Sequence, residues 1–579
     1  MLVATHDGAS VGATHLQHAK RAMNNLPREG SHQLAASQST GSLAEPRDEA
    51  AAGLNQPADS QQILDGKPTV RLVAVIDIGA TSIRMSVAEI TPDGQFRTLD
   101  TLVQAVDLGR EAFDTRRISR ATIERSVNIL RRYQRVVREY GIRSASQIRV
   151  VATSAVREAT NRLAFTDRVY IATGLIVEVI DEAEVNRVTF MGVNPHLEQD
   201  EALRAARSVV IEVGGGSTEL LVMRDGNMLL SDTFRLGSLR LVQSLESLNS
   251  TTSRRRQLME YQIARIIDRV SETVADEPNT RLIAIGGDIR FAARVILDHW
   301  DPDTLAEIST EKLETLTNEV LRLNEDLLVK KYALSYIEAA TVGPALLVYL
   351  LLARHFGVET VLVSDSNLRD GLVYEMAVRG SWTEAFRKQI VRSAITLGRK
   401  CDFDEEHAIH VADMASELFG QLKREHRLAD RFEVLLHVAA ILYQVGTFIN
   451  ARSSHKHAMY IIRNSELFGL SRNDLLLVGL VARYHRRASP QPTHEGYSTL
   501  DREGRVVVSK LAAILRVAIA LDETRSGRVR QIRCVREAKR LIIETPGVDD
   551  VSMEQLGLRQ NGSMFLEVFG IPVMLRAGA

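Results

Sequence analysis

Cysteine is almost absent from this sequence of 579 residues. The two cysteines, Cys401 and Cys534, are too few and too far apart to build a disulfide framework or a zinc site. A large net charge of either sign is missing as well, because 72 basic side chains stand against 73 acidic ones and the formal net charge is -1. Such a balance creates no long-range field that would attract nucleic acid or an anionic membrane, so we expect neither as a partner. A polyanionic substrate would have to be bound by local groups.

Long apolar segments are also lacking. The first residues contain neither the basic stretch nor the apolar stretch of a secretory signal. The longest apolar run, near Ala345–Ala353, is about half of a membrane span. We therefore expect a soluble cytoplasmic protein. Residues 1–68 are rich in Ala, Ser, Gln, Gly and His without a helical or strand period, which predicts a disordered N-terminal extension.

After this extension, two similar strand–loop–strand patterns stand far apart in the sequence. Each pairs two apolar or alternating segments around a loop rich in glycine and hydroxyl groups, and each ends in a turn signal. The predicted strands are Leu72–Ile76, Ile83–Ile90, Val209–Val213 and Glu219–Met223. Asp77 and Glu212 occupy equivalent places, 135 residues apart. The repetition predicts two similar half-domains that face one another.

The periodicity predicts an α/β class as far as about residue 380. Helical patterns lie between the strands, at Ile118–Tyr140, Ala183–Gly192, Arg254–Val274 and Glu338–His355. Residues 385–525 are predicted to form successive amphipathic helices, such as Ala408–Leu422 and Phe432–Leu442. Strand patterns return in the last part of the chain, at Arg540–Glu544 and Met564–Phe569, which predicts a small α+β module there.

The two loops have the chemistry of phosphate binding. Gly79 would let the backbone approach a phosphate, Thr81 and Ser82 offer hydroxyl donors, and Asp77 could hold a hydrated divalent cation. The run Gly214-Gly215-Gly216-Ser217-Thr218 offers the same chemistry, with Glu212 and Glu219 on either side. A single glycine-rich loop is more often a tight turn, but a matched pair favours an anion site.

Five segments in order resemble motifs of the Ppx/GppA phosphatase family. They are AVIDIGATSIR from residue 74, VATSAVREATN from 151, VIEVGGGSTEL from 210, AIGGDIRFAA from 284 and VLVSDSNLRDGLV from 361. Together they span residues 72–373. The resemblance implies an actin-like fold of two ribonuclease H-like halves and Mg²⁺-assisted attack of water on a terminal phosphoryl group. It also implies polyphosphate or guanosine pentaphosphate as substrate, and a homodimer.

The resemblance assigns roles to residues of this chain. Arg84 and Arg157 would clamp phosphate oxygens as bidentate donors that stay charged. Asp77 would hold the metal, and Glu212 and Glu219 would hold the metal or orient water. The complete set of expected phosphate-binding residues is Asp77, Gly79, Thr81, Ser82, Arg84, Arg157, Gly214, Gly215, Gly216, Ser217, Thr218, Gly286 and Gly287.

The chain departs from the family at the glutamate that activates water. The family pattern I-S-G-x-E-E-A-R corresponds to residues 180–187, where Asp181 and Glu182 replace the serine and glycine. Glu184 keeps the first glutamate position and Val185 occupies the second. Glu184 is therefore the candidate catalytic base, and the acidic start of this helix is also what dipole stabilisation alone would favour. Two smaller departures are Glu212 in place of aspartate and Asp288 in place of threonine.

The helical region resembles the HD-type domain of long family members, without its metal ligands. The positions of the His-Asp pair hold Tyr443 and Gln444, and the later aspartate position holds Ile519. Tyr, Gln and Ile at these positions cannot build a site for a hard cation. The expected organisation is an extension at 1–68, actin-like subdomains at 69–200 and 201–382, the HD-like domain at 383–526 and a C-terminal module at 527–579.

Three functions remain open from the sequence. The first is a phosphohydrolase of polyphosphate or guanosine pentaphosphate. The second is a catalytically weakened sensor of the same fold that binds polyphosphate or an alarmone. The third is a sugar or acetate kinase, which the five motifs favour least.

Overall fold

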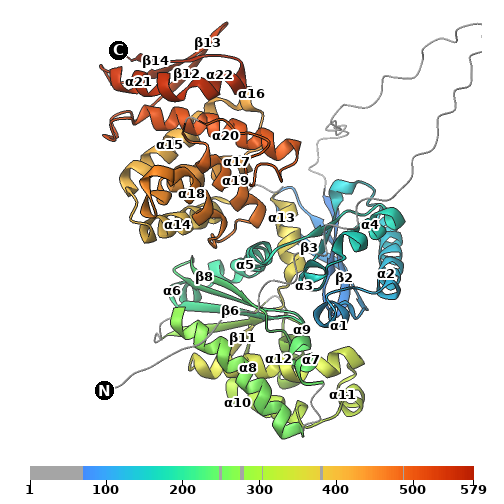
Figure 1. Cartoon of the computed structure of the whole chain (residues 1–579). Coiled ribbons are helices and arrows are strands. Elements are labelled where there is room, and N and C mark those ends of the chain that lie inside the picture. The colour runs from blue at the N-terminus through green and yellow to red at the C-terminus, as the bar shows by residue number, and fades with distance from the viewer. Residues whose placement is uncertain are drawn as a thin grey trace, which may run out of the picture. The chain divides into compact units, whose positions relative to one another are not determined.

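The computed structural model of the chain describes residues 70–246, 251–273, 279–302, 304–378, 382–486 and 488–578 (Figure 1). The predicted N-terminal extension at 1–68 lies outside the described residues. Strands of the described part form three sheets, and helices follow between and after them.

The first sheet is built around the first predicted hairpin. Its order is β3-β2-β1-β4-β5, with the bounds β1 Arg71–Ile78, β2 Ser82–Ile90, β3 Phe96–Ala105, β4 Ile148–Ala152 and β5 Val177–Val179. β1 pairs antiparallel with β2 and parallel with β4. Within the β1–β2 pair, Asp77 lies opposite Arg84. The last six residues of β1 are buried, because both of its faces are covered.

The second sheet repeats this arrangement and adds an edge strand. Its order is β10-β11-β9-β6-β7-β8, with the bounds β6 Arg207–Val213, β7 Thr218–Arg224, β8 Asn227–Phe234, β9 Thr280–Ile285, β10 Ala306–Ser309 and β11 Thr360–Val363. β6 pairs antiparallel with β7 and parallel with β9, and Glu212 lies opposite Glu219. The α/β class with two similar halves is confirmed, and β10 is the addition that the repeat did not predict.

Helices separate the strands of both sheets. Their bounds are α1 Leu108–Asp114, α2 Arg120–Glu139, η1 Ala145–Gln147, α3 Ser154–Glu158, α4 Arg162–Thr173, α5 Glu182–Gln199, α6 Glu201–Ala205, α7 Ser238–Glu246, α8 Thr252–Thr273, α9 Gly287–Ile296, α10 Thr310–Val320, α11 Glu325–Tyr332, α12 Tyr336–His355 and α13 Leu368–Ala377. Side-chain caps fix several starts: Ser119 caps α2, and Ser335 caps α12 through a capping box. α5 runs past its predicted end at Gly192 and contains Pro195.

Among the described residues, one helix, α12, is long and apolar enough to cross a membrane by length and composition. Its most apolar window is 72% buried inside the protein, where Leu346, Leu350 and Tyr349 are completely covered. The core helix of a globular domain passes the same test, so this helix is weak evidence for a membrane span.

Successive helices occupy most of residues 384–521, where the sequence predicted helices over 385–525. The bounds are α14 Glu384–Lys400, α15 Glu405–Gln421, α16 Lys423–His426, α17 Arg431–Leu442, η2 Val445–Phe448, η3 Ala451–Ser453, α18 Ser454–Arg463, α19 Arg472–Arg483 and α20 Arg502–Leu521. Their apolar residues form one core that continues into the C-terminal residues and onto α5.

The last part of the chain combines a three-stranded sheet with two helices. The bounds are β12 Arg533–Glu537, β13 Arg540–Thr545, α21 Ser552–Asn561, α22 Ser563–Phe569 and β14 Val573–Ala577, in the sheet order β12-β13-β14. The strand predicted at Met564–Phe569 was wrong, because this segment is helix α22. Its buried residues Met564 and Phe565 are adjacent in sequence and the ring of Phe569 packs on Phe565 one turn later, which is helical spacing.

Candidate functional site

The two glycine-rich loops close their hairpins with the same hydrogen bond. Gly79 N–H donates to Ser82 O at 3.0 Å, and Gly214 N–H donates to Ser217 O at 2.9 Å. Each bond tightens the turn directly after a buried strand. The loops are therefore equivalent in geometry as well as in sequence.

The carbonyl groups of both loops are bound by the segments that follow. Ala80 O accepts from Gly109 N–H at 2.7 Å, and Gly215 O accepts from Leu239 N–H at 3.1 Å. In the described part of the chain, the N–H groups of Ala80, Thr81, Gly215 and Gly216 have no recorded acceptor. Unpaired donors in successive residues form the kind of concavity that binds anions.

The two loops pack against each other. A methyl group added at Gly215 would lie 3.3 Å from the Cβ of Ala80 and 3.3 Å from the Cγ2 of Thr81. Gly237, which the sequence did not mark as functional, lies closer still: a methyl group there would come within 2.3 Å of Gly215 O. Since that atom belongs to the backbone, only glycine fits at residue 237 without a shift of the loop.

Three acidic residues lie at the ends of the loops. Asp77 and Glu219 are 4% and 6% exposed, and Glu212 is partly buried. Burial raises the pKa of Glu212 above its ordinary value, and the nearby negative charge of Asp77 raises it further. Burial and the charge of Glu212 together raise the pKa of Glu219 to about 7. The structure therefore brings the carboxylates of both halves into one electrostatic cluster, which we call the carboxylate cluster.

Arginines surround the carboxylate cluster. Arg84 Nη1 lies 3.7 Å from Asp77 Oδ2, and Arg369 Nη1 lies 4.0 Å from the same oxygen. Arg290 lowers the pKa of Glu212, and Arg157 lowers the pKa of Glu219, each opposing the effect of burial. Sequence reasoning chose Arg84 and Arg157 but missed the other two. Arg290 and Arg369 both lie in motifs given above. The sequence could not show that they come close to carboxylates, because those carboxylates belong to strands far away in the sequence.

The hydroxyl groups of the loops differ in availability. Ser82 Oγ is buried without a hydrogen-bond partner, whereas Ser217 Oγ donates to Glu219 Oε1 at 2.6 Å. Thr218 Oγ1 donates to Leu236 O. Thr81 lies against the opposite loop, and its side chain has no recorded hydrogen bond in the described part of the chain. Of the predicted hydroxyl donors, Ser217 and Thr218 are therefore already engaged within the protein, whereas Ser82 is not.

The third predicted loop meets the carboxylate cluster at the start of α9. Gly286 has a φ of +114°, and a methyl group on it would lie 3.1 Å from Tyr349 Oη and 3.8 Å from Glu212 Cγ. Burial raises the pKa of Asp288 to about 6, although Arg84 and Arg290 lower it. Gly287 has open space around its α-carbon. The loop thus adds a fourth acidic group beside Arg84.

Glu184, the candidate base from the sequence, takes part in the cap of a helix. It completes a capping box at the start of α5: its N–H donates to Asp181 Oδ1 at 2.9 Å, and Asp181 N–H donates to its Oε2 at 3.3 Å. Burial, followed by the charge of Asp181, raises its pKa. Its recorded interactions join it to Asp181, Arg187 and Asp474 and to no member of the carboxylate cluster. Val185 is 7% exposed and packs among apolar residues.

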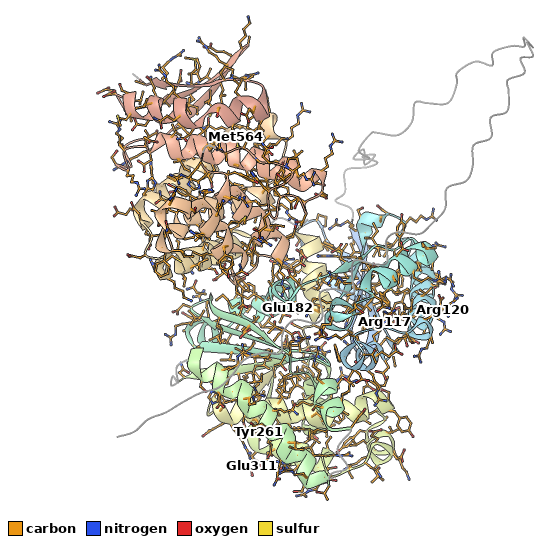
Figure 2. All side chains as sticks on the ribbon, viewed as in Figure 1. Arg117, Arg120, Glu182, Tyr261, Glu311 and Met564 are labelled. Carbon is orange, nitrogen blue, oxygen red and sulfur yellow. The ribbon has the colours of Figure 1, made fainter. Side chains whose placement is uncertain are left out.

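Glu184 lines a cavity of about 1030 Å³ that also contains residues of the helical region. Arg157 and Asp181 form part of one wall, and Arg431, Arg472 and Asp474 form part of another. Arg472 N–H donates to Asp181 Oδ2 at 2.6 Å, and its guanidinium lies 3.3 Å from Glu182, which is labelled in Figure 2. Glu182 also pairs with Arg157 at 3.3 Å. The two residues that replace the family's serine and glycine therefore contact the helical region.

The oxygen donors of the carboxylate cluster fit a hard divalent cation. Asp77 Oδ1 and Ser82 Oγ are buried and have no hydrogen-bond partner. Among the described residues, no group of three or more His, Cys, Asp or Glu side chains is arranged to enclose a metal. Mg²⁺ does not need such a group, because it keeps several waters and is usually held by one or two carboxylates together with substrate oxygens.

The helical region contains a hydrogen-bonded chain that includes Tyr443 and Gln444. His407 Nδ1 lies 2.7 Å from Asp522 Oδ2, and its Nε2 lies 2.7 Å from Tyr443 Oη. Gln444 Nε2 donates to the same hydroxyl at 2.7 Å. Tyr443 thus satisfies the buried His407 of α15, and Gln444 satisfies the hydroxyl of Tyr443. Asp522, which directly follows α20, is a member of this chain that the sequence did not reveal.

Comparison with known proteins places this chain in a family. A sequence model described as the Ppx/GppA phosphatase family matches residues 86–379, and one described as Ppx/GppA phosphatase, domain III, matches residues 390–550. The chain belongs to the Ppx/GppA phosphatase family. The resemblance carried by the five motifs is confirmed, and at the level of the family the chain is a phosphohydrolase.

Two relatives share the name guanosine-5'-triphosphate,3'-diphosphate pyrophosphatase. The protein from Aeromonas hydrophila subsp. hydrophila is 25% identical over 456 residues, which cover 78% of this chain and 87% of that protein. The protein from Aeromonas salmonicida is 24% identical over 481 residues, covering 82% of this chain and 92% of that protein.

Solved structures of similar proteins match slightly more than half of the chain. The structure of an exopolyphosphatase from Cytophaga hutchinsonii is 21% identical with a TM-score of 0.49, covering 53% of this chain and 98% of that one. The Ppx/GppA family member from Aquifex aeolicus is 21% identical with a TM-score of 0.46, covering 54% of this chain and 100% of that one.

Proposed function

We propose that this Ppx/GppA family member hydrolyses the terminal phosphoanhydride bond of inorganic polyphosphate or guanosine pentaphosphate. The observation that carries the proposal is the meeting of two equivalent loops, with unpaired N–H groups, at a cluster of buried carboxylates and arginines. Transfer of a phosphoryl group to water needs positioning and neutralisation of charge more than covalent catalysis, and this arrangement supplies both.

The loops would bind the terminal phosphate group. The N–H groups of Ala80, Thr81, Gly215 and Gly216 are the donors for its oxygens, and Ser82 Oγ is a further donor without a partner. Arg84 and Arg157 would neutralise the chain beyond it. Because the carbonyl groups of both loops are held by later segments, the donors are fixed before the substrate arrives, which reduces the cost of organising them.

Asp77 and Glu212 are the residues that would hold Mg²⁺, with water and substrate oxygens completing its coordination. The bound cation would neutralise charge that develops on the phosphate oxygens. Both carboxylates have a raised pKa because they are buried, so they have more to gain from a cation than exposed carboxylates do. Arg84 and Arg369 both lie near Asp77 Oδ2, and Asp77 Oδ1 has no hydrogen-bond partner.

Glu219 is the residue that we favour as the proton acceptor. Its pKa of about 7 suits a general base that works near neutral pH. As water attacks the terminal phosphorus, a new P–O bond forms and the bond to the bridging oxygen breaks. The water's proton passes to the carboxylate of Glu219, and the bridging oxygen leaves on the shortened chain. Glu184 remains the second candidate, because it lies on α5, the helix that corresponds to the family's glutamate motif.

The test is phosphate release by the purified full chain with Mg²⁺, using long-chain polyphosphate and guanosine pentaphosphate in parallel. Release from either substrate is expected, and the ratio of the two rates identifies the preferred one. Glu219→Gln should lower the rate by about a hundredfold or more, in the range of general-base catalysis, while Glu184→Gln should lower it much less. No release from either substrate across several divalent cations would refute the proposal.

The second candidate function is a sensor that binds a phosphate chain without turnover. Val185 favours it, because this buried apolar residue stands where the family has a glutamate. In Val185→Glu, a large gain of phosphate release would support the sensor function of the native chain. No gain in a folded variant would support the relocated base. Direct binding of polyphosphate by a parent chain that releases no phosphate would decide for the sensor.

A further inference from the structure

We propose that Arg240 is the positioning residue that sets the second glycine-rich loop, residues 214–218, against the half-domain of the first sheet. Arg240 is the third residue of α7, and its side chain is 18% exposed. The inference rests on the proposed function, because that function makes this loop a phosphate-binding element. Arg240 would act through the loop and would not touch the substrate.

The start of α7 binds three successive carbonyl groups of this loop. Gly214 O and Gly215 O accept from backbone N–H groups of α7 at 3.0 and 3.1 Å. The third carbonyl, Gly216 O, accepts from Arg240 Nε at 2.6 Å. Because a peptide group is planar and trans, a carbonyl that points to α7 sends the N–H of the next residue the other way. Arg240 therefore directs Ser217 N–H, which has no recorded acceptor in the described part of the chain.

The first loop holds the equivalent carbonyl without an arginine. Thr81 stands where the second loop has Gly216, and Thr81 O accepts from Val106 N–H at 3.1 Å. Among the described residues, no backbone N–H is recorded as a donor to Gly216 O. The side chain of Arg240 thus does in the second loop what a backbone N–H does in the first. The conformation of the second loop depends on this side chain.

The guanidinium of Arg240 also reaches the half-domain of the first sheet. Its Nη2 donates to Glu158 Oε1 of α3, and its Cζ lies 3.8 Å from the ring centre of Phe113 in α1. The loop itself is close to the same helices, because a methyl group on Gly216 would come within 2.4 Å of Ser154 Oγ. The carbonyl, the carboxylate and the ring use different parts of one planar group. A lysine ammonium cannot make all three contacts.

Glu158 connects this contact to an arginine that is predicted to bind phosphate. It directly follows Arg157 on α3, a helix of five residues, so holding one of them also places the backbone of the other. Burial raises the pKa of Glu158, but Arg240 and Arg235 lower it below its ordinary value, so the carboxylate stays charged at neutral pH. Arg240 thereby ties the N–H donors of the second loop to Arg157 of the other half-domain.

The equivalent arginine of the first half-domain lacks the bond to a loop. Arg110 is the third residue of α1, and its Nη2 donates to Glu246 Oε1 of α7 at 2.5 Å. Its side chain is 55% exposed, and in the described part of the chain it has no recorded hydrogen bond to either loop. Both arginines therefore bridge the half-domains, but Arg240 alone of the two also holds a loop carbonyl.

The test compares variants of the full chain by hydrogen–deuterium exchange without substrate and by phosphate release with Mg²⁺. Arg240→Lys keeps the charge but has neither an Nε nor a planar group, so Gly216 O loses its donor. Peptides covering residues 212–219 should exchange about fivefold faster than in the parent. The kcat for the better substrate should fall by about tenfold or more while KM changes less, because misplaced donors weaken transition-state binding most. Glu158→Gln should change both values in the same direction by a smaller factor.

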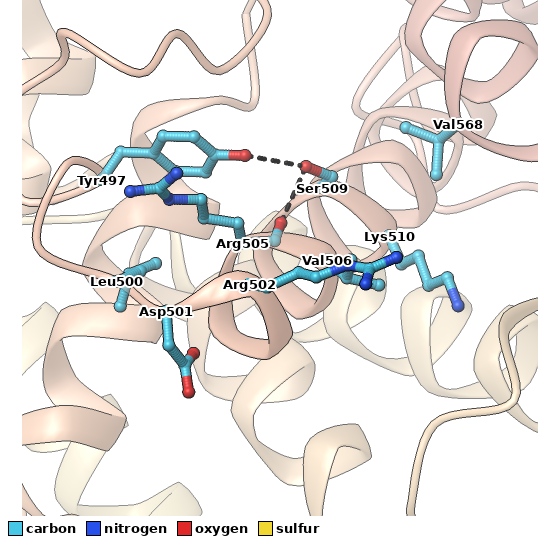
Figure 3. A pocket seen from close by; sticks show the side chains of 9 residues that line it. All are labelled: Tyr497, Leu500, Asp501, Arg502, Arg505, Val506, Ser509, Lys510 and Val568. Carbon is cyan, nitrogen blue, oxygen red and sulfur yellow. Dashed lines mark hydrogen bonds between the residues drawn. The ribbon is translucent and has the colours of Figure 1, made fainter. Parts of the chain in front are cut away.

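Two controls separate this role from a general loss of stability. Arg110→Gln breaks the equivalent contact between the half-domains. Arg505→Lys makes the same substitution in the helical region, where Arg505 Nη2 donates to Ser498 O at 3.1 Å and the guanidinium lies 5.8 Å from the ring centre of Tyr497 (Figure 3). Both controls should leave the exchange of residues 212–219 at the value of the parent.

Circular dichroism shows which variants are folded, and Glu158→Gln decides if Arg240→Lys is not. The proposal is overturned if the folded variants keep the parent's exchange at residues 212–219, or if a control changes it equally. With an active parent, an unchanged kcat in Arg240→Lys also overturns it. A parent that releases no phosphate refutes the proposed function instead, and the exchange of residues 212–219 then decides on Arg240.

Discussion

Asp181 and Arg472, 291 residues apart in the sequence, are joined by a hydrogen bond of 2.6 Å from the backbone N–H of Arg472 to Asp181 Oδ2. The other carboxylate oxygen of Asp181 caps α5 by accepting from Glu184 N–H. One side chain therefore fixes the start of the helix that carries Glu184 and ties it to the helical region. A serine, which the family has at this position, would cap the helix but is too short to make the second contact.

The serine variant separates these two roles. Asp181→Ser should keep the cap of α5 but speed hydrogen–deuterium exchange in peptides containing Arg472, because that N–H loses its acceptor. Asp181→Ala removes both contacts, and loss of a cap typically costs about 1 kcal/mol of stability. Thermal melting and exchange of both variants measure the two effects. Identical exchange at Arg472 in the parent and in Asp181→Ser would show that the bond does not form in solution.

The backbone contact between Gly237 and Gly215 predicts that residue 237 controls the second loop. A methyl group at residue 237 would lie within 2.3 Å of Gly215 O and 2.5 Å of Gly216 N, so the loop would have to move. Gly237→Ala should lower phosphate release by at least tenfold. A displacement of the loop by a fraction of an ångström would move its N–H donors out of hydrogen-bonding geometry with the phosphate. Gly420→Ala is the matched control, because Gly420 lies in α15 with open space around its α-carbon. Equal activity of the two variants would contradict this prediction.

Asp288 is predicted to cost stability at neutral and alkaline pH. Its pKa is raised to about 6 from 3.8, so the folded protein binds the proton more tightly than the unfolded chain does. The favourable contribution of the protonated form is complete below pH 3.8 and is lost as the pH rises through 6. Asp288→Thr should therefore raise the melting temperature at pH 8 and change it much less at pH 5. An equal shift at both pH values would show that the carboxylate is not the cause.

The fold was predictable where the sequence repeats itself. Two strands around DIGATS and two around GGGST are enough to indicate paired half-domains, and both hairpins are present with equivalent loop hydrogen bonds. β10 and the helical state of Met564–Phe569 were not predictable in this way. β10 is a short edge strand outside the repeated pattern, and an apolar run without clear alternation suits a strand or a helix equally well.

The candidate site was predictable in its residue types but not in its connections. Asp77, Glu212 and the glycines could be chosen because strand and loop signals lie in sequence next to them. The neighbours of those residues could not be chosen, because they come from distant elements. Arg369 lies in the first turn of α13 and beside Asp77, and Gly237 precedes α7 and lies beside Gly215. Glu184 shows the reverse: the motif marked it, but its carboxylate accepts a hydrogen bond in a helix cap.

Arg369 is predicted to set the affinity of the proposed metal site. This arginine is 6% exposed, its Nε donates to Ser86 Oγ at 2.9 Å, and its Nη1 lies 4.0 Å from Asp77 Oδ2. Its charge lowers the pKa of Asp77 against the effect of burial, and so keeps that carboxylate available for a cation. In Arg369→Gln the pKa of Asp77 should rise, because only Arg84 then opposes burial.

The expected result is a higher Mg²⁺ concentration for half-maximal phosphate release, by about tenfold, with a larger defect at pH 6 than at pH 8 because protonation of Asp77 competes with the cation. Arg369→Lys keeps the charge and loses the planar contact with Ser86, so its Mg²⁺ dependence should remain close to that of the parent even if the variant is less stable. The comparison separates an electrostatic role from a packing role. If Arg369→Lys and Arg369→Gln shift the Mg²⁺ dependence equally, the charge of this arginine does not act on Asp77. That result would contradict the proposal that Arg369 sets the affinity of the metal site.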